Sequence, residues 1–107
     1  MSWAYSKQLS LQQLQQSARP VLIFKHSNRC SISSMAFNRV QKAAEALDEK
    51  FDFYLIDVVA DRSLSLQLAD ELAVEHESPQ AIVLNQGKVI YSESHMGINP
   101  QEILSLV

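Results

Sequence analysis

The sequence predicts an α/β fold, a mixed sheet of about four strands with helices on both faces. Two observations predict it. Short apolar runs alternate with segments of helical periodicity along most of the chain, and the last two runs are close enough to form a hairpin. The chain has 107 residues, of which 47% are hydrophobic and 20% charged, so we expect one domain spanning residues 1–107 around one core.

The first part of the chain contains two expected helices and the strand between them. Leucine and alanine recur at helical spacing over residues 11–18, which predicts a short helix that ends before Pro20. Residues 21–24 form an unbroken apolar run, as in a strand that is buried on both faces of a sheet. Apolar residues then fall three and four apart over residues 32–47, which predicts an amphipathic helix.

The middle of the chain repeats this alternation. Residues 51–59 predict a second strand, with Phe53 and Leu55 on the same face. Leucines then repeat every four residues over residues 63–74, which predicts a helix. A third strand is expected over residues 81–84, where the chain is again apolar.

The C-terminal part contains a turn, a strand and a last helix. Gly87 can adopt a positive φ in the turn that precedes a fourth strand over residues 88–91. Asn99 is a cap residue, Pro100 suits the first helical position, and Glu102 is in the first turn. A helix is therefore expected from Pro100 onward.

Composition and cysteine count argue against several classes of function. A formal charge of −3 and a pI near 5.5 do not fit a protein that binds the phosphate backbone of nucleic acids. No apolar stretch approaches the ~18 residues that a membrane span needs. Cys30 is the only cysteine, so it forms no internal disulfide and does not by itself make a zinc site. We therefore expect a cytoplasmic protein without a secretory leader and with no nucleic-acid or membrane partner.

The order of the expected elements, together with several short motifs, resembles the thioredoxin fold over nearly the whole chain. Cys30 lies where a strand-to-helix loop enters the long helix, Ser78 and Pro79 precede the third strand, and Gly97 precedes the last helix. More narrowly, residues 24–33 (Phe-Lys-His-Ser-Asn-Arg-Cys-Ser-Ile-Ser) are similar to the active-site segment of the monothiol bacilliredoxins. These are small bacterial general-stress proteins with a Cys-x-x-Ser motif.

The resemblance makes Cys30 the expected catalytic residue. Only a thiolate attacks a disulfide, and the unpaired N–H groups and positive dipole end of a helix N-terminus favour an anion. His26 and Arg29 lie in the same segment, where each either supports the thiolate or faces solvent. The alternative for Cys30 is a small buried hydrophobe, the usual state of a free intracellular cysteine.

Ser33 takes the position at which dithiol members of the fold carry the resolving cysteine. A hydroxyl forms no disulfide, so an external thiol must resolve any mixed disulfide on Cys30. Ser33 either donates a hydrogen bond to the thiolate or adds polarity to the helix end beside Ser31, which stands where the family typically has proline. The resemblance also implies that Pro79 follows a cis peptide bond and turns the backbone of Ser78 toward a bound partner.

The resemblance implies a thiol-disulfide oxidoreductase of the monothiol bacilliredoxin type. Its partners would be S-thiolated proteins, from which Cys30 removes a low-molecular-weight thiol, with bacillithiol as the expected one. That thiol is a co-substrate, and a second small thiol or a reductase regenerates Cys30. No tightly bound cofactor is expected. His76 and His95 have no metal-ligand spacing to Cys30, so no metal site is expected either.

Two other functions stay open at this point. A non-catalytic thioredoxin-like binding or stress-response module would use the groove around Cys30, Ser78 and Pro79 to hold partners without turnover. A monothiol iron-sulfur carrier is the weaker alternative, because the glutaredoxins of that kind carry a Cys-Gly-Phe-Ser signature that this sequence lacks. The pH dependence of Cys30 alkylation distinguishes the exchange enzyme from the binding module.

Overall fold

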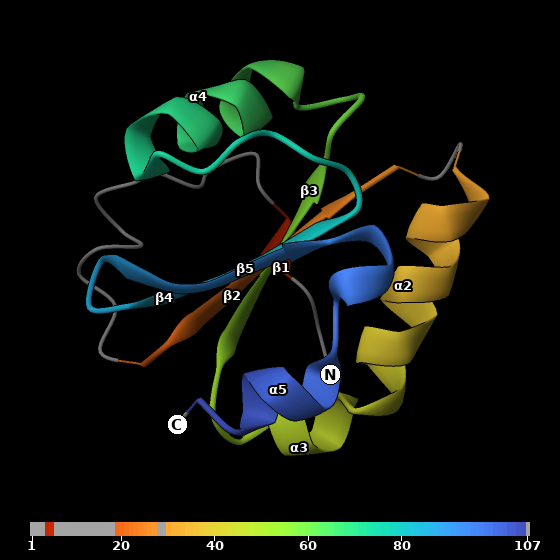
Figure 1. The fold of residues 1–107 in the computed structure, drawn as a ribbon, viewed down its shortest axis with the longest axis vertical. Helices are drawn as coiled ribbons and strands as arrows, with labels where there is room; N and C mark the ends of the chain where they lie inside the picture. The colour runs from red at the N-terminus through yellow and green to blue at the C-terminus, as the bar shows by residue number, and fades with distance from the viewer. Residues whose placement is uncertain (1–3, 6–18, 28–29, 107) are drawn as a thin grey trace.

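A computed structural model describes residues 4–5, 19–27 and 30–106 (Figure 1). The described residues form a five-stranded sheet with the order β1-β3-β2-β4-β5. Its strands are β1 (Ala4–Tyr5), β2 (Val21–His26), β3 (Asp52–Asp57), β4 (Gln80–Asn85) and β5 (Lys88–Ser94). The first three are parallel to one another, whereas β4 runs antiparallel to β2 and β5 antiparallel to β4. The predicted mixed sheet is confirmed, with the two-residue edge strand β1 in addition.

Helices cover both faces of this sheet (Figure 1). On one face lie α2 (Ser31–Lys42), α3 (Ala44–Asp48) and α5 (Pro100–Leu104), and on the other lies α4 (Arg62–Leu72). A short 3₁₀ helix, η2 (His95–Gly97), packs against α2. The helix expected over residues 11–18 lies outside the described residues. Within the described ranges, no helix combines the length and apolarity needed to cross a membrane.

The prediction of a single helix over residues 32–47 is wrong at Ala43, where the structure has two helices in its place. Ala43 leaves helical geometry (φ −98°, ψ 14°) and separates α2 from α3. Its N–H still bonds the carbonyl of Val40 at 3.1 Å, so the chain turns tightly without unwinding. The apolar spacing continues across this break because Val40 and Leu47 bury into the same core cluster. Periodicity alone therefore gave no sign of the interruption.

The apolar core is divided into two clusters by the sheet. Leu22 and Phe24 of β2 pack with the helices α2, α3 and α5, while Val21 and Ile23 pack with Leu68 of α4. All of these side chains are at most 1% exposed. The prediction of a strand buried on both faces is confirmed, and each such side chain contributes ~1.5–3 kcal/mol through burial.

The C-terminal signals behave as predicted. Gln86 and Gly87 have φ of 52° and 82°, the paired positive values that a two-residue hairpin turn requires. The side chain of Asn99 accepts a hydrogen bond from the N–H of Gln101 at 2.9 Å. Pro100 follows as the first residue of α5.

Candidate functional site

Cys30 lies directly before α2, at the entry of the helix. Its backbone is extended (φ −118°, ψ 121°), and its N–H bonds the carbonyl of Ser27 at 3.2 Å. Its own carbonyl accepts the N–H of Ser34 at 3.1 Å, which begins the helical hydrogen bonding. Cys30 is partly exposed, and the first turn of α2 carries no acidic residue that would repel an anion. The thiol therefore lies directly before the N–H groups that begin α2.

The hydroxyl of Ser33 fixes the segment that leads to the cysteine. Ser33 is fully buried, and its Oγ accepts the N–H of Ser27 at 3.0 Å. The same Oγ lies 2.7 Å from Nδ1 of His26. Because the oxygen accepts from Ser27, its own proton is free to be donated to the imidazole. The hydrogen bonds of this hydroxyl in the described structure thus go to the end of β2 and the following loop rather than to the thiol.

His26 ends β2 and is held by aromatic packing. Its ring stacks on Phe37 of α2, with centroids 5.1 Å apart and an interplanar angle of 26°. Burial lowers the pKa of His26 below its ordinary 6.5, and the carboxylate of Asp57, opposite on β3, partly counteracts this. The imidazole is therefore neutral near pH 7, which suits Nδ1 as an acceptor from Ser33. A neutral ring adds no positive charge beside Cys30.

Ser31 and Arg29 are the two other predicted residues of the cysteine segment. Ser31 is the first residue of α2 and is exposed. The position at which the family typically has proline is therefore a solvent-facing start of the helix. Arg29 lies outside the described residues.

Ser78 and Pro79 precede β4. The peptide bond between them is cis, as the resemblance implies. Pro79 is buried, and its carbonyl accepts the N–H of His95 at 3.0 Å, which joins this segment to η2. The Oγ of Ser78 is buried without a hydrogen-bond partner in the part of the chain that the structure describes.

The sheet brings the cysteine segment and the Ser78–Pro79 segment to the same end of its strands. In the antiparallel β2–β4 ladder, Gln80 pairs with Lys25. Pro79 is one residue before Gln80, and His26 is one residue after Lys25, so both lie at the end of the sheet where β2 leads into the loop of Cys30.

Comparison with known proteins decides the family. A family model described as monothiol bacilliredoxin BrxC matches residues 5–103. The chain belongs to the monothiol bacilliredoxin family. The match spans nearly the whole chain and confirms the resemblance seen in residues 24–33.

Solved structures agree with a bacilliredoxin of the thioredoxin fold. A chain proposed to be an oxidoreductase with a thioredoxin fold is 31% identical, with a TM-score of 0.77 and coverage of 88% of this chain and 82% of that one. A mutant thioredoxin from Halobacterium salinarum is 19% identical (TM-score 0.68, covering 96% and 85%). The thioredoxin of Malassezia sympodialis is 21% identical (TM-score 0.63, covering 88% and 76%). The last two show the fold alone, whereas the family and the first structure support a thiol redox role.

Two exposed apolar side chains lie near the cysteine end of α2 in this bacilliredoxin. Ile32 and Met35 project from the first turns of α2 and are 42% and 54% exposed. Met96 of η2 is 71% exposed and lies with Arg39 and Pro100, toward the other end of α2.

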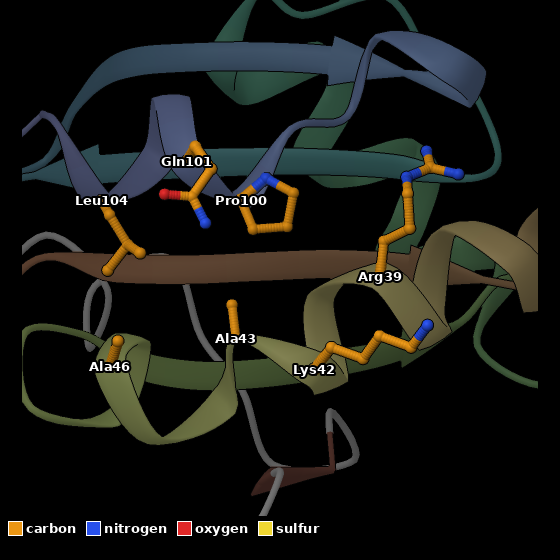
Figure 2. A pocket seen from close by; sticks show the side chains of 7 residues that line it. All are labelled: Arg39, Lys42, Ala43, Ala46, Pro100, Gln101 and Leu104. Atoms are coloured by element: carbon orange, nitrogen blue, oxygen red, sulfur yellow. The ribbon is translucent and has the colours of Figure 1, made fainter.

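A hollow of about 350 Å³ lies at the other end of α2 (Figure 2). It is lined by Arg39, Lys42, Ala43, Ala46, Pro100, Gln101 and Leu104. In Figure 2 the Lys42 amino group extends away from the apolar side chains of Ala43 and Leu104. The hollow is therefore separate from the cysteine site.

The described ranges contain no group of three or more histidine, cysteine or acidic residues arranged to hold a metal ion.

A polar cluster that the sequence did not predict is buried behind the site. Lys25 follows the apolar run of β2 and is fully buried, with Nζ 3.0 Å from the carbonyl of Ser65 and 3.3 Å from Nδ1 of His76. One signal was available. Strand alternation places residue 25 on the same face as Val21 and Ile23, toward α4.

Replacing Ser33 with alanine is expected to lower the free energy of unfolding by about 1–3 kcal/mol, because it leaves the N–H of Ser27 and Nδ1 of His26 without their partner. Urea denaturation measures this change. Ser34→Ala is the matched control, since Ser34 is exposed on the same helix and its loss should cost less than ~0.5 kcal/mol. Equal effects of the two substitutions would contradict the assigned role of the Ser33 hydroxyl.

Proposed function

We propose that this bacilliredoxin is a monothiol thiol-disulfide exchange enzyme of the bacterial cytoplasm. It removes a low-molecular-weight thiol, bacillithiol, from mixed disulfides on protein cysteines. The observation that carries the proposal is the position of Cys30. Cys30 is the only cysteine of this chain, which belongs to the bacilliredoxin family. It is partly exposed at the N-terminus of α2, and there is no second cysteine with which it could form an internal disulfide.

The reaction proceeds in two exchange steps. The Cys30 thiolate attacks the bacillithiol sulfur of the protein mixed disulfide, the protein cysteine leaves as a thiolate, and Cys30 carries bacillithiol in a disulfide. A second bacillithiol thiolate, or a thiol of a reductase, then attacks the bacillithiol sulfur on Cys30. The Cys30 thiolate is restored, and the two external sulfurs leave as a disulfide. No tightly bound cofactor takes part in either step.

The neighbouring residues support this chemistry in different ways. The N-terminus of α2 stabilises the attacking and leaving thiolate of Cys30. Ser33 and His26 hold the preceding loop in place. The Ser78–Pro79 segment and the exposed side chains of Ile32 and Met35 provide the surface for the S-thiolated protein.

A transfer assay tests the proposal. The full chain is mixed with a protein whose cysteine carries bacillithiol, and intact mass spectrometry follows both proteins. We expect the substrate to lose one bacillithiol while this chain gains one, with the adduct mapping to Cys30. Cys30→Ser should gain none and leave the substrate modified.

The result that would overturn the proposal is an unmodified Cys30 beside a substrate that stays modified or is cleared equally by Cys30→Ser. Binding of the modified protein without transfer, together with Cys30 alkylation no faster than that of a simple thiol at neutral pH, would instead establish the non-catalytic binding module.

A further inference from the structure

Lys25 is a buried cation on the side of the sheet away from Cys30. It is 0% exposed and lies in β2 between β3 and β4, facing α4. Its Nζ donates to the carbonyl of Ser65 in α4 at 3.0 Å and to Nδ1 of His76 at 3.3 Å. Both acceptors are uncharged, because a ring nitrogen that accepts from an ammonium carries no proton. Retaining a buried cation with neutral partners costs stability, so its position calls for a role other than core packing.

The partners of Lys25 connect it to the loop of residues 73–79, which joins α4 to β4. His76 is the middle residue of this loop, and its Nδ1 lies 3.2 Å from the Oγ of Ser65 as well. Gln80, which pairs with Lys25 across the ladder, donates from Nε2 to the carbonyl of Glu75 at 2.9 Å. The loop is thus tied to β2 and β4 through a side chain at residue 76 and through the backbone at residue 75.

The same loop ends in the Ser78–Pro79 segment of the candidate site. Only Glu77 separates His76 from Ser78. A movement of residues 75 and 76 away from the sheet would therefore also displace Ser78 and Pro79. Gln80 is 2% exposed, and its Oε1 has no hydrogen-bond partner in the described part of the chain, so its contact with the loop runs through Nε2.

We propose that Lys25 is a positioning residue that holds the loop of residues 73–79 from behind the sheet, so that Ser78 and Pro79 form the docking wall for the thiolated protein. The docking part of this inference rests on the proposed function, whereas the anchoring part does not. Lys25 contacts neither the cysteine nor a substrate. Its loss therefore weakens recognition of the protein partner and leaves the reactivity of Cys30 itself unchanged.

The test uses the full chain with Lys25→Met, which keeps the length and apolar stem of the side chain and removes the donor. We expect hydrogen exchange of the amides in residues 73–78 to accelerate about tenfold, the effect of losing one hydrogen bond to a charged group. Lys88→Met, at an exposed lysine of β5, is the matched control and should leave exchange of the loop unchanged.

The catalytic readout separates positioning from general damage. With a bacillithiolated protein as substrate, Lys25→Met should raise KM roughly threefold or more while kcat and the rate of Cys30 alkylation by iodoacetamide stay at the wild-type level. His76→Leu breaks the same link from the loop side. It should reproduce both changes, and combining it with Lys25→Met should add little further.

Unchanged exchange of residues 73–78 in Lys25→Met would overturn the anchoring role. Faster exchange with an unchanged KM, or a fall in kcat in place of the rise in KM, would overturn the docking role. If wild-type protein transfers no bacillithiol, the proposed function fails, and the exchange experiment still decides whether Lys25 anchors the loop.

Discussion

Replacing Ser33 with cysteine is expected to prevent the mixed disulfide on Cys30 from accumulating. A thiol at this position attacks the Sγ of Cys30 once Cys30 carries the small thiol, which leaves as a thiolate while an internal disulfide forms. Cys30 is the N-cap residue and Ser33 the third residue of α2; residues three apart along a helix have Cβ atoms about 5–6 Å apart, and a disulfide requires about 4 Å. An internal thiol acts at an effective concentration of at least millimolar order, so release should be on the order of 100-fold faster than with ~10 μM external thiol.

Intact mass spectrometry distinguishes the two fates. Wild-type protein treated with a bacillithiolated substrate and no other thiol should show the mass of one added bacillithiol, whereas Ser33→Cys should show only the loss of two hydrogens. Ser63→Cys is the control for an added thiol, because Ser63 is exposed on α4 across the sheet. The prediction fails if Ser33→Cys keeps the adduct as long as Ser63→Cys does. That result would mean that the contacts with Ser27 and His26 hold residue 33 away from the sulfur.

Hydrophobic periodicity predicted the elements that bury a regular apolar face. The leucines of α4 are an example, since Leu68 is buried and Leu64 and Leu72 pack against the same cluster. Hydrophobic periodicity did not predict two features of the fold. Strand β1 has two residues, too few to show alternation, and the break at Ala43 involves no glycine or proline and leaves the apolar spacing intact. Backbone geometry at such points is set by tertiary packing rather than by local propensity.

The candidate site could be predicted only as far as its local motifs extend. Cys30 was placed by the change from a strand to a helical pattern around it, and the cis bond at Pro79 followed from family resemblance. Lys25 was missed because a lysine that follows an apolar run indicates the end of a strand. Its partners Ser65 and His76 are 40 and 51 residues away, and no spacing in one sequence shows that they meet.

The free energy of unfolding is expected to rise by about 3 kcal/mol between pH 8 and pH 10.5 because of Lys25 alone. Burial lowers the pKa of its ammonium from the ordinary 10.5 to about 8. Between these values the unfolded chain binds a proton that the folded chain does not, so raising the pH favours the folded state. Below pH 8 both states are protonated, and the full cost of the buried charge is present. This sign is the opposite of that of a salt-bridged lysine, whose contribution to stability is lost as pH rises.

Urea denaturation of wild type and Lys25→Met at several pH values, with reductant present, measures this contribution. Burial also raises the pKa of Tyr91, which opposes the trend near pH 10, so the informative quantity is the difference between the two proteins. The free energy of unfolding of the wild type should rise relative to that of Lys25→Met as the pH increases from 8 to 10.5. The values for Lys88→Met should follow the wild-type curve. Parallel curves for wild type and Lys25→Met would show that the ammonium is solvated in the folded protein. The predicted slope therefore tests the burial on which the anchoring of the loop of residues 73–79 depends.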